Sequence, residues 1–464
     1  MDNNKKEFLG TAPIGKLLFK LALPTVVAQL INMLYNLIDR IYIGHMPVDG
    51  DLALTGVGVC LPIIMIVSAF AALVGTGGAP RTSIFMGKKD MKSAEKTLGN
   101  CFVLQIVISA ILTTVLLCFS RPLLLAFGAS ENTIEYAVNY LNIYAIGTLF
   151  VQMTLGMNAF ITAQGFSKTA MLSVLIGAVT NIALDPIFIF ACNMGVQGAA
   201  LATILSQFLS AIWVVWFLFS KKAQVRLSFK NMGLSPKIIF PCIFLGMATF
   251  IMQSSESIIF VCFNASLLEY GGDLAVGAMT IFTSVMQFAM LPLQGIGQGA
   301  QPILSYNYGA RNEKRVKKTY WLLLASSMSY SLLLYLIVMI FPGGFCHMFT
   351  TKPELISFAS QMMRVYFAAM FIFGAQMACQ MTFVSIGYAT ASIIVAIVRK
   401  FVLLLPLIYI MPVIMEDKVL GIYMAEPIAD IIAVTFTIIL FAIQFRKAMK
   451  KLEANKEQPL PQNI

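Results

Sequence analysis

Long apolar segments dominate the chain and leave room only for short connections between them. Twelve such segments lie at about 17–44, 52–80, 98–119, 134–163, 168–191, 196–219, 238–267, 274–305, 319–341, 356–385, 391–412 and 419–444. A helix that crosses a bilayer needs about 20 apolar residues. Charged residues make up 11% of the chain, whereas soluble domains carry about a quarter. We therefore predict an all-α polytopic membrane protein with twelve transmembrane helices, and exclude a soluble enzyme, a nucleic-acid binder and a single-pass receptor.

The two halves of the sequence repeat each other. GKKDMKSAEKT at 87–97 aligns without gaps on GARNEKRVKKT at 309–319, and Gly165 matches Gly387 at the same offset. Because each half holds six spans, both halves start on the same side of the membrane, and a pseudo-two-fold axis along the membrane normal relates them. The predicted domains are an N-terminal lobe (1–219), a basic cytoplasmic linker (220–237), a C-terminal lobe (238–445) and a polar cytoplasmic tail (446–464).

The two signs of charge separate between alternate loops, and the net charge is +11. Basic residues gather at Lys5, Lys6, Lys16 and Lys20 and in segments 87–96, 220–237, 311–318 and 446–451. The other loops are mostly acidic, with Asp49, Asp51, Glu131, Glu135, Glu269, Asp273, Glu416 and Asp417. Basic loops face the cytoplasm. We expect a multi-pass protein of the plasma membrane with both termini cytoplasmic and the first span retained, since no cleavage site follows it.

Motifs for metals and nucleotides are missing from the sequence. The eight cysteines are scattered without CxxC pairs, and His45 and His347 lie far apart. We therefore expect buried, unpaired cysteines and no His/Cys metal site. The sequence also lacks a P-loop, an HExxH motif and a GxSxG motif. We expect neither ATP hydrolysis nor a cofactor.

Four segments carry a family pattern, in order along the chain. They are LALPTVVAQLINMLYNLIDRIYIGH at 21–45, NIALDPIFI at 181–189, VQGAALATILSQ at 196–207 and GQGAQPILSYNYGARNEKRV at 297–316. Together they resemble the multidrug and toxic compound extrusion (MATE) transporters, and the acidic residues are similar to those of the DinF-like branch. The resemblance implies twelve helices in two lobes, an ion site in the N-terminal lobe, and drug antiport driven by H⁺ or Na⁺.

Two carboxylates lie inside predicted helices, where an ionisable side chain is costly. Asp39 lies about 22 Å along its helix from Pro24, and Asp185 lies about 26 Å along the fifth helix, so both belong to the outer half of the bilayer. Asn181 is one turn before Asp185 on the same face, and Thr203 reaches a similar depth. Oxygens of these types bind Na⁺ and can also hold a proton. All four residues also match the cation site of the family they resemble.

Each of these assignments has a structural alternative. Asp39 could be a boundary charge paired with Arg40, and Asn181 and Thr203 could simply join helices. Pro24 removes a backbone hydrogen bond and could act as a hinge when Asp39 changes charge, although proline kinks also serve packing.

Further intramembrane charges lie in the second half. Glu256 resembles the acid of the NorM-like branch, but the tenth span lacks the carboxylate that completes that site. It is therefore interpreted either as a substrate-attracting or auxiliary charge or as a structural acid. Glu426 and Asp430, one turn apart in the last span, are interpreted as interhelical contacts with Arg399 and Lys400 as partners.

The predicted substrate cavity uses polar residues of both halves: Tyr35, Asn158, Glu256, Gln298 and Gln301. Tyr35 shares a helix face with Asp39, and Asn158 matches a polar residue of the family's pocket. For the glutamines and Pro302 in GQGAQP, packing of small residues and a helix break are favoured over ligand contact. The 28 methionines and 35 phenylalanines suit a deformable cavity for flat cations.

The leading prediction is a secondary active multidrug efflux transporter that works by alternating access. A lipid-linked oligosaccharide flippase of the same superfamily is the alternative, but it would need a basic cavity, and the intramembrane charges are mainly acidic. Two alternatives come from other classes of protein. An intramembrane enzyme would need paired catalytic groups, and a channel would need a continuous pore. Expected partners are small organic cations, drugs and membrane lipids, with no nucleic acid, and the protein is expected to be a monomer.

Overall fold

The computed structural model describes residues 8–46 and 50–454, and helices make up almost all of this part. Nine helical segments are long and apolar enough to span a membrane. They are α3 (Ile14–Gly44), α4 (Gly50–Gly87), α5 (Met91–Ala126), α8 (Ser167–Pro186) with its π-helical end η1 (Ile187–Ala191), α9 (Gly195–Phe219), α10 (Pro236–Gly309), α11 (Glu313–Ile340), α15 (Ala389–Ile397) running through the π-helical turn η4 (Val398–Leu404) into α16 (Leu405–Ile414), and α17 (Lys418–Ala454).

Two more spans are bent, and one long helix folds back on itself. α6 (Ile134–Ile146) and α7 (Thr148–Ala163) meet at 58°, and α13 (Pro353–Tyr366) meets the segment Met370–Ser385, which holds η3 (Met370–Ile372) and α14 (Phe373–Ser385), at 45°. The 74 residues of α10 would form a rod of about 111 Å if straight. At Gly272 the backbone takes φ 63° and ψ −161°, a conformation open to glycine. α10 therefore supplies two spans, and the described chain has the predicted twelve.

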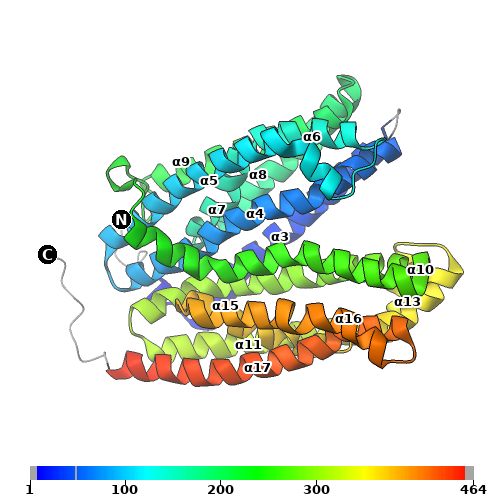
Figure 1. Cartoon of the computed structure of the whole chain (residues 1–464). Coiled ribbons are helices and arrows are strands. Elements are labelled where there is room, and N and C mark those ends of the chain that lie inside the picture. Colours follow the sequence, from blue (N-terminus) through cyan, green and yellow to red (C-terminus); the bar gives the residue numbers. More distant parts are fainter. Residues whose placement is uncertain (1–7, 47–49, 455–464) are drawn as a thin grey trace.

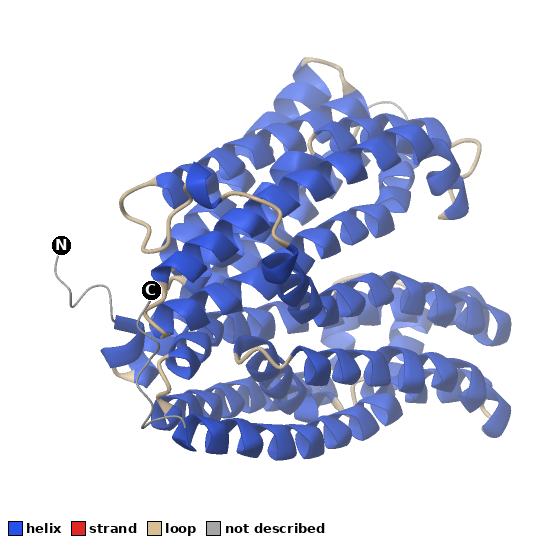
Figure 2. Ribbon diagram, turned by 60° about the vertical axis from the view of Figure 1, so that its left-hand side comes forward, coloured by secondary structure: helices blue, strands red, loops and turns tan. Residues whose placement is uncertain are grey.

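The helices form two lobes that are closed at one end and separate at the other. α3 to α9 make one lobe and α10 to α17 the other, and they diverge away from the end where the described chain begins and finishes (Figures 1 and 2). At the closed end a single hydrophobic core draws on both lobes, including Met86, Leu98, Tyr306 and Tyr320. Farther out each lobe has its own core, around Tyr140 in the first and Tyr366 in the second.

The two lobes repeat each other at atomic detail. Gly165 and Gly387 both have positive φ, 85° and 80°. Equivalent hydrogen bonds also recur at the offset that separates these glycines, from Ser83 Oγ to the Ala163 carbonyl (2.6 Å) and from Ser305 Oγ to the Ser385 carbonyl (2.7 Å). The predicted internal duplication is therefore visible in the fold.

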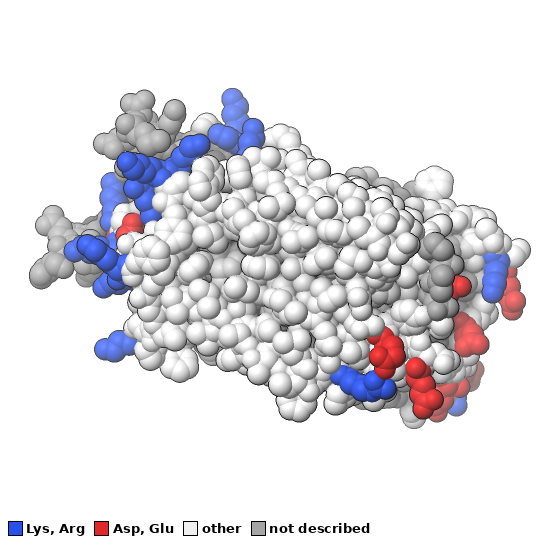
Figure 3. All heavy atoms as spheres, turned by 90° about the horizontal axis from the view of Figure 1, so that it is seen from above, with Lys and Arg blue, Asp and Glu red and all other residues white. Residues whose placement is uncertain are grey.

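Basic and acidic side chains gather at opposite ends of the molecule (Figure 3). Lys and Arg cover the closed end, and most of the exposed Asp and Glu lie at the open end. Lys5, Lys6, Asp49 and residues 455–464 of the predicted tail lie outside the described residues. The first residues of that tail belong to α17, which continues to Ala454.

Candidate functional site

Asp39, Asn181 and Asp185 come together inside the N-terminal lobe, where α3 packs on α8. Asp39 is 9% exposed, and the other two are fully buried. The carboxyl groups of Asp39 and Asp185 are direct neighbours. Asn181 Nδ2 donates to Asp185 Oδ1 at 3.3 Å. Arg40 is exposed, and its charge still acts on Asp39.

Three oxygens at this site have no hydrogen-bond partner: Asp39 Oδ1, Asn181 Oδ1 and Asp185 Oδ2. A buried acceptor without a donor is destabilising, and two adjacent carboxylates repel each other unless a positive charge lies between them. Hard oxygens from three side chains are what Na⁺ prefers, and a proton shared by the carboxyl groups satisfies the same need. The residues present therefore fit a bound monovalent cation.

The surrounding side chains add residues that the sequence did not single out. Thr203 lies beside Tyr140 of α6, and Tyr35 lies beside Gln207 of α9. Gln207 lies one turn after Thr203, so helical spacing could have revealed it. Tyr140 had no such signal, because it lies in a different span from every predicted ligand. Four helices, α3, α6, α8 and α9, thus enclose the carboxyl pair.

The backbone beside the site is irregular. Asp185 precedes Pro186, and the helix widens into the π-helical η1 directly afterwards. Proline lacks the N–H that continues the helical ladder, and π-helical turns occur frequently at functional sites. In α3, by contrast, the helix passes through Pro24 without a break, and Thr25 Oγ1 donates to the Gly295 carbonyl of the other lobe at 2.6 Å. The hinge stays a prediction.

The predicted substrate residues are not one cluster. Asn158 Nδ2 donates to the Ala170 carbonyl at 3.1 Å, and Gln380, its equivalent in the second lobe, donates to the Ser392 carbonyl at 3.2 Å. This repeated contact favours a structural role for Asn158. Gln298 accepts from Gln29 Nε2 across the lobes at 3.3 Å, and Gln301 Nε2 is buried without a partner.

The GQGAQP segment packs closely but does not break its helix. Gly299 lies against the backbone of α3 at Ala22, and Gly297 lies against the Met381 side chain, as predicted for small residues. The predicted helix break at Pro302 is wrong, because α10 continues to Gly309. Neighbouring helices compensate for one missing backbone donor in such proteins.

The acids of the C-terminal lobe have fixed basic partners. Arg399 Nε lies 2.8 Å from Asp430 Oδ1, and its Nη2 lies 3.4 Å from Glu426 Oε1. This part of the interhelical prediction is confirmed. Lys400 pairs instead with Glu256, at 2.7 Å between Nζ and Oε1. That pair was not predicted, since the two residues lie on spans that are far apart in the sequence.

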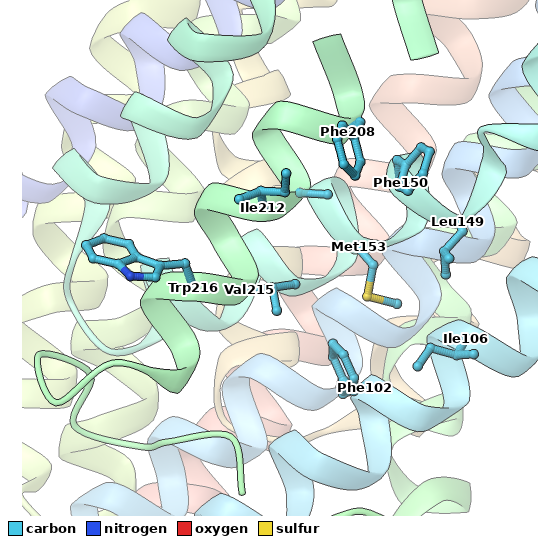
Figure 4. A pocket seen from close by; sticks show the side chains of 10 residues that line it. Phe102, Ile106, Leu149, Phe150, Met153, Phe208, Ile212, Val215 and Trp216 are labelled. Atoms are coloured by element: carbon cyan, nitrogen blue, oxygen red, sulfur yellow. The ribbon is translucent and has the colours of Figure 1, made fainter. Parts of the chain in front are cut away.

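A hollow of about 450 Å³ lies elsewhere in the N-terminal lobe, between α5, α7 and α9. Its lining is entirely apolar, with Phe102, Met153, Phe208 and Trp216 among the side chains shown in Figure 4. None of the predicted substrate or cation residues lines it. Its lining holds no carboxylate, so it is not the candidate cation site.

Two stretches of the chain, residues 24–187 and 247–410, match the family model described as MatE. The chain belongs to the MatE family. One MatE match falls in each lobe, so each lobe carries one copy, and the resemblance to MATE transporters is confirmed. Because MatE proteins are transporters, the chain is a multi-pass membrane protein and not an enzyme.

Individual relatives agree with the MatE assignment. The multidrug export protein MepA of Staphylococcus haemolyticus (strain JCSC1435) is 26% identical over 376 residues, covering 81% of this chain and 82% of MepA. MepA of Staphylococcus aureus (strain N315) is 23% identical over 411 residues, covering 89% and 90%. A solved MATE family transporter of the MOP superfamily, described as outward-facing and as a multidrug resistance protein, superposes with a TM-score of 0.90 at 22% identity, over 97% of this chain and 99% of that one. It has the same two-lobe fold.

Proposed function

We propose that this chain is a secondary active multidrug efflux transporter that exports cationic, amphipathic drugs in exchange for H⁺ or Na⁺. The observation that carries the proposal is the buried Asp39–Asp185 pair with three unpartnered oxygens around it. A negative site of this kind exchanges one cation for another. The MepA relatives, named as multidrug export proteins, support drugs as the cargo.

The proposed mechanism follows from the end of the molecule at which the two lobes are in contact. With the basic end placed in the cytoplasm, the lobes are closed inside and open outside, so an external H⁺ or Na⁺ reaches Asp39 and Asp185. Its binding lowers the negative charge of the pair and weakens the attraction for a cationic drug, which leaves. Bending of α3 at Pro24 and rocking of the lobes then open the shared core at the cytoplasmic end.

The remaining assignments complete the proposal. The domains are the two lobes, the linker and the tail, at 1–219, 238–445, 220–237 and 446–464. The protein is a monomer in contact with lipid, and both of its termini are cytoplasmic. The ion site of the N-terminal lobe is that of the DinF-like branch. Asn181 and Thr203 complete the cation site, and Tyr35 and Glu256 face the substrate. A lipid-linked oligosaccharide flippase is less well supported, because Arg399 and Lys400 are already paired with acids.

Transport by purified protein in liposomes tests this function. Ethidium loaded inside liposomes should leave faster when a pH or Na⁺ gradient directed inward is imposed on the protein's outward face. An ionophore that removes the gradient should abolish the effect. Gradient-independent leakage at the same rate, or an ion conductance without ethidium movement, would show a channel instead.

A further inference from the structure

The C-terminal lobe carries its own buried charge cluster, at the place in the repeat that corresponds to the cation site. Gly198 in VQGAA and Gly421 in VLGIY lie 223 residues apart and mark the same place in the two halves. Counted from these glycines, Glu426 and Asp430 on α17 take the positions that Thr203 and Gln207 take on α9. Instead of a space for a mobile cation, this lobe has two tethered cations, Arg399 and Lys400 in η4, and a third carboxylate, Glu256 of α10. These five charged side chains of the C-terminal lobe lie on three spans, and we refer to them as the C-lobe cluster.

Arg399 is held firmly in the C-lobe cluster. Its guanidinium contacts Asp430 and Glu426 at 2.8 and 3.4 Å and lies 4.7 Å from the centroid of the Phe373 ring. The side chains of Arg399 and both acids are 6% exposed. Arg presents several donors in a fixed plane, so it suits a permanent structural pair.

Lys400 is held differently. Its side chain is 3% exposed, and Nζ contacts Glu256 Oε1 at 2.7 Å. The charge of Lys400 also acts on Glu426, so two acids compete for one ammonium group. A lysine is a compact point charge on a flexible stem. It can turn from one carboxylate to the other without leaving the protein interior.

Glu256 is the member of the C-lobe cluster that another cation can reach. Its side chain is 51% exposed although Lys400 is buried, and protein surrounds it at longer range, as expected for a group at the edge of a cleft. The adjacent Ser257 lies 4.0 Å from Met65 of α4, in the other lobe. This stretch of α10 therefore faces the space between the lobes.

With every group counted as ionised, the C-lobe cluster has one more carboxylate than it has cations. Three carboxylates face two cations, and Tyr366, the further ionisable side chain within their field, supplies none. A charge imbalance inside a membrane protein is costly. An organic cation placed against the exposed side of Glu256 would remove it.

We propose that Lys400 is a specificity-determining residue, an internal cation that occupies Glu256 and must be displaced by a cationic substrate. On displacement, Lys400 Nζ turns to Glu426 while Arg399 stays on Asp430. Substrates with a localised positive charge displace it, and neutral amphipathic molecules do not. The proposal depends on the proposed export of organic cations.

Binding of ethidium to the purified full-length protein in detergent, measured by fluorescence anisotropy, tests the competition. Lys400→Met should tighten ethidium binding by about tenfold, since the cation no longer has a competitor for Glu256. Glu256→Gln should weaken binding, and the double variant should bind like Glu256→Gln alone. Lys418→Met, which removes an equal charge near the Tyr270 ring, is the matched control and should change nothing.

An equal effect of Lys400→Met with Glu256 present and in the Glu256→Gln background, or no effect in either, would overturn the proposal. If Lys400→Met does not fold, Glu426→Gln provides the test from the opposite direction. It removes the second partner of Lys400 and should weaken ethidium binding, and unchanged or tighter binding would refute the competition. Wild-type ethidium efflux in liposomes is scored separately. Normal efflux with no Lys400 effect rejects the competition alone, whereas absent efflux with the Lys400 effect intact rejects the proposed function alone.

Discussion

Replacing Asp39 by asparagine tests the cation site with the smallest change in shape. Asn keeps the size of the side chain and removes the negative charge from a group that is 9% exposed and next to Asp185. A cation bound about 4 Å from that carboxylate gains about 4 kcal/mol at an effective dielectric constant of about 20. Loss of that interaction weakens cation binding by about a thousandfold.

The assay is gradient-driven ethidium efflux from liposomes, at protein levels matched by size-exclusion chromatography. Asp39→Asn should reduce gradient-driven efflux to the background of empty liposomes while the protein keeps its normal elution and melting temperature. Glu131→Gln, at an exposed acid in a loop, is the matched control and should transport normally. Efflux by Asp39→Asn at half the wild-type rate or more would refute the assignment of the site.

Three further changes test the packing of the lobes. Arg399→Ala should lower stability by about 3–5 kcal/mol, because it leaves Asp430 buried without its cation and Glu426 with only the charge of Lys400. Arg121→Ala, in an exposed pair with Glu135, should cost about 1 kcal/mol or less, and equal melting temperatures would contradict this. Gly87→Ala should impair efflux, since its new methyl group would collide with the Tyr306 backbone of the other lobe. Gly233→Ala is the control and should not impair efflux, because Gly233 has open space around it. Equal efflux rates of the two variants would show that the lobes do not pack through Gly87. Arg315→Met should favour opening of the closed end of the molecule, because Arg315 Nη2 donates to the carbonyls of Leu9 and Ala12 at 3.2 and 2.8 Å and so ties residues 9–12 to the second lobe. Unchanged thiol labelling of a cysteine placed at this contact between the lobes would argue against it.

Much of the fold could be predicted because it depends on local sequence. The twelve spans follow from apolar length, and the two lobes follow from matched segments such as 87–97 and 309–319. The meeting of Asn181 with Asp185 follows from helical spacing. Hydropathy and periodicity report these features directly.

The remaining features depend on contacts between distant spans. The Lys400–Glu256 pair and the Tyr140–Thr203 contact join helices that are far apart in the sequence. The sequence of either helix alone does not determine how the two helices are rotated relative to each other. Pro302 predicted a helix break, but the packing of α10 against its neighbours keeps the helix intact. Local signals for backbone breaks are therefore weaker here than tertiary packing.

The most direct test of the central claim is to measure drug and ion movement in the same liposomes. Ethidium efflux should drive an opposite flux of H⁺, followed with an entrapped pH dye, or of Na⁺, followed with ²²Na. Both fluxes should disappear together in Asp39→Asn and in Asp185→Asn. Ethidium efflux that proceeds with no counterflow of either ion, or that survives in both variants, would contradict exchange at the Asp39–Asp185 site.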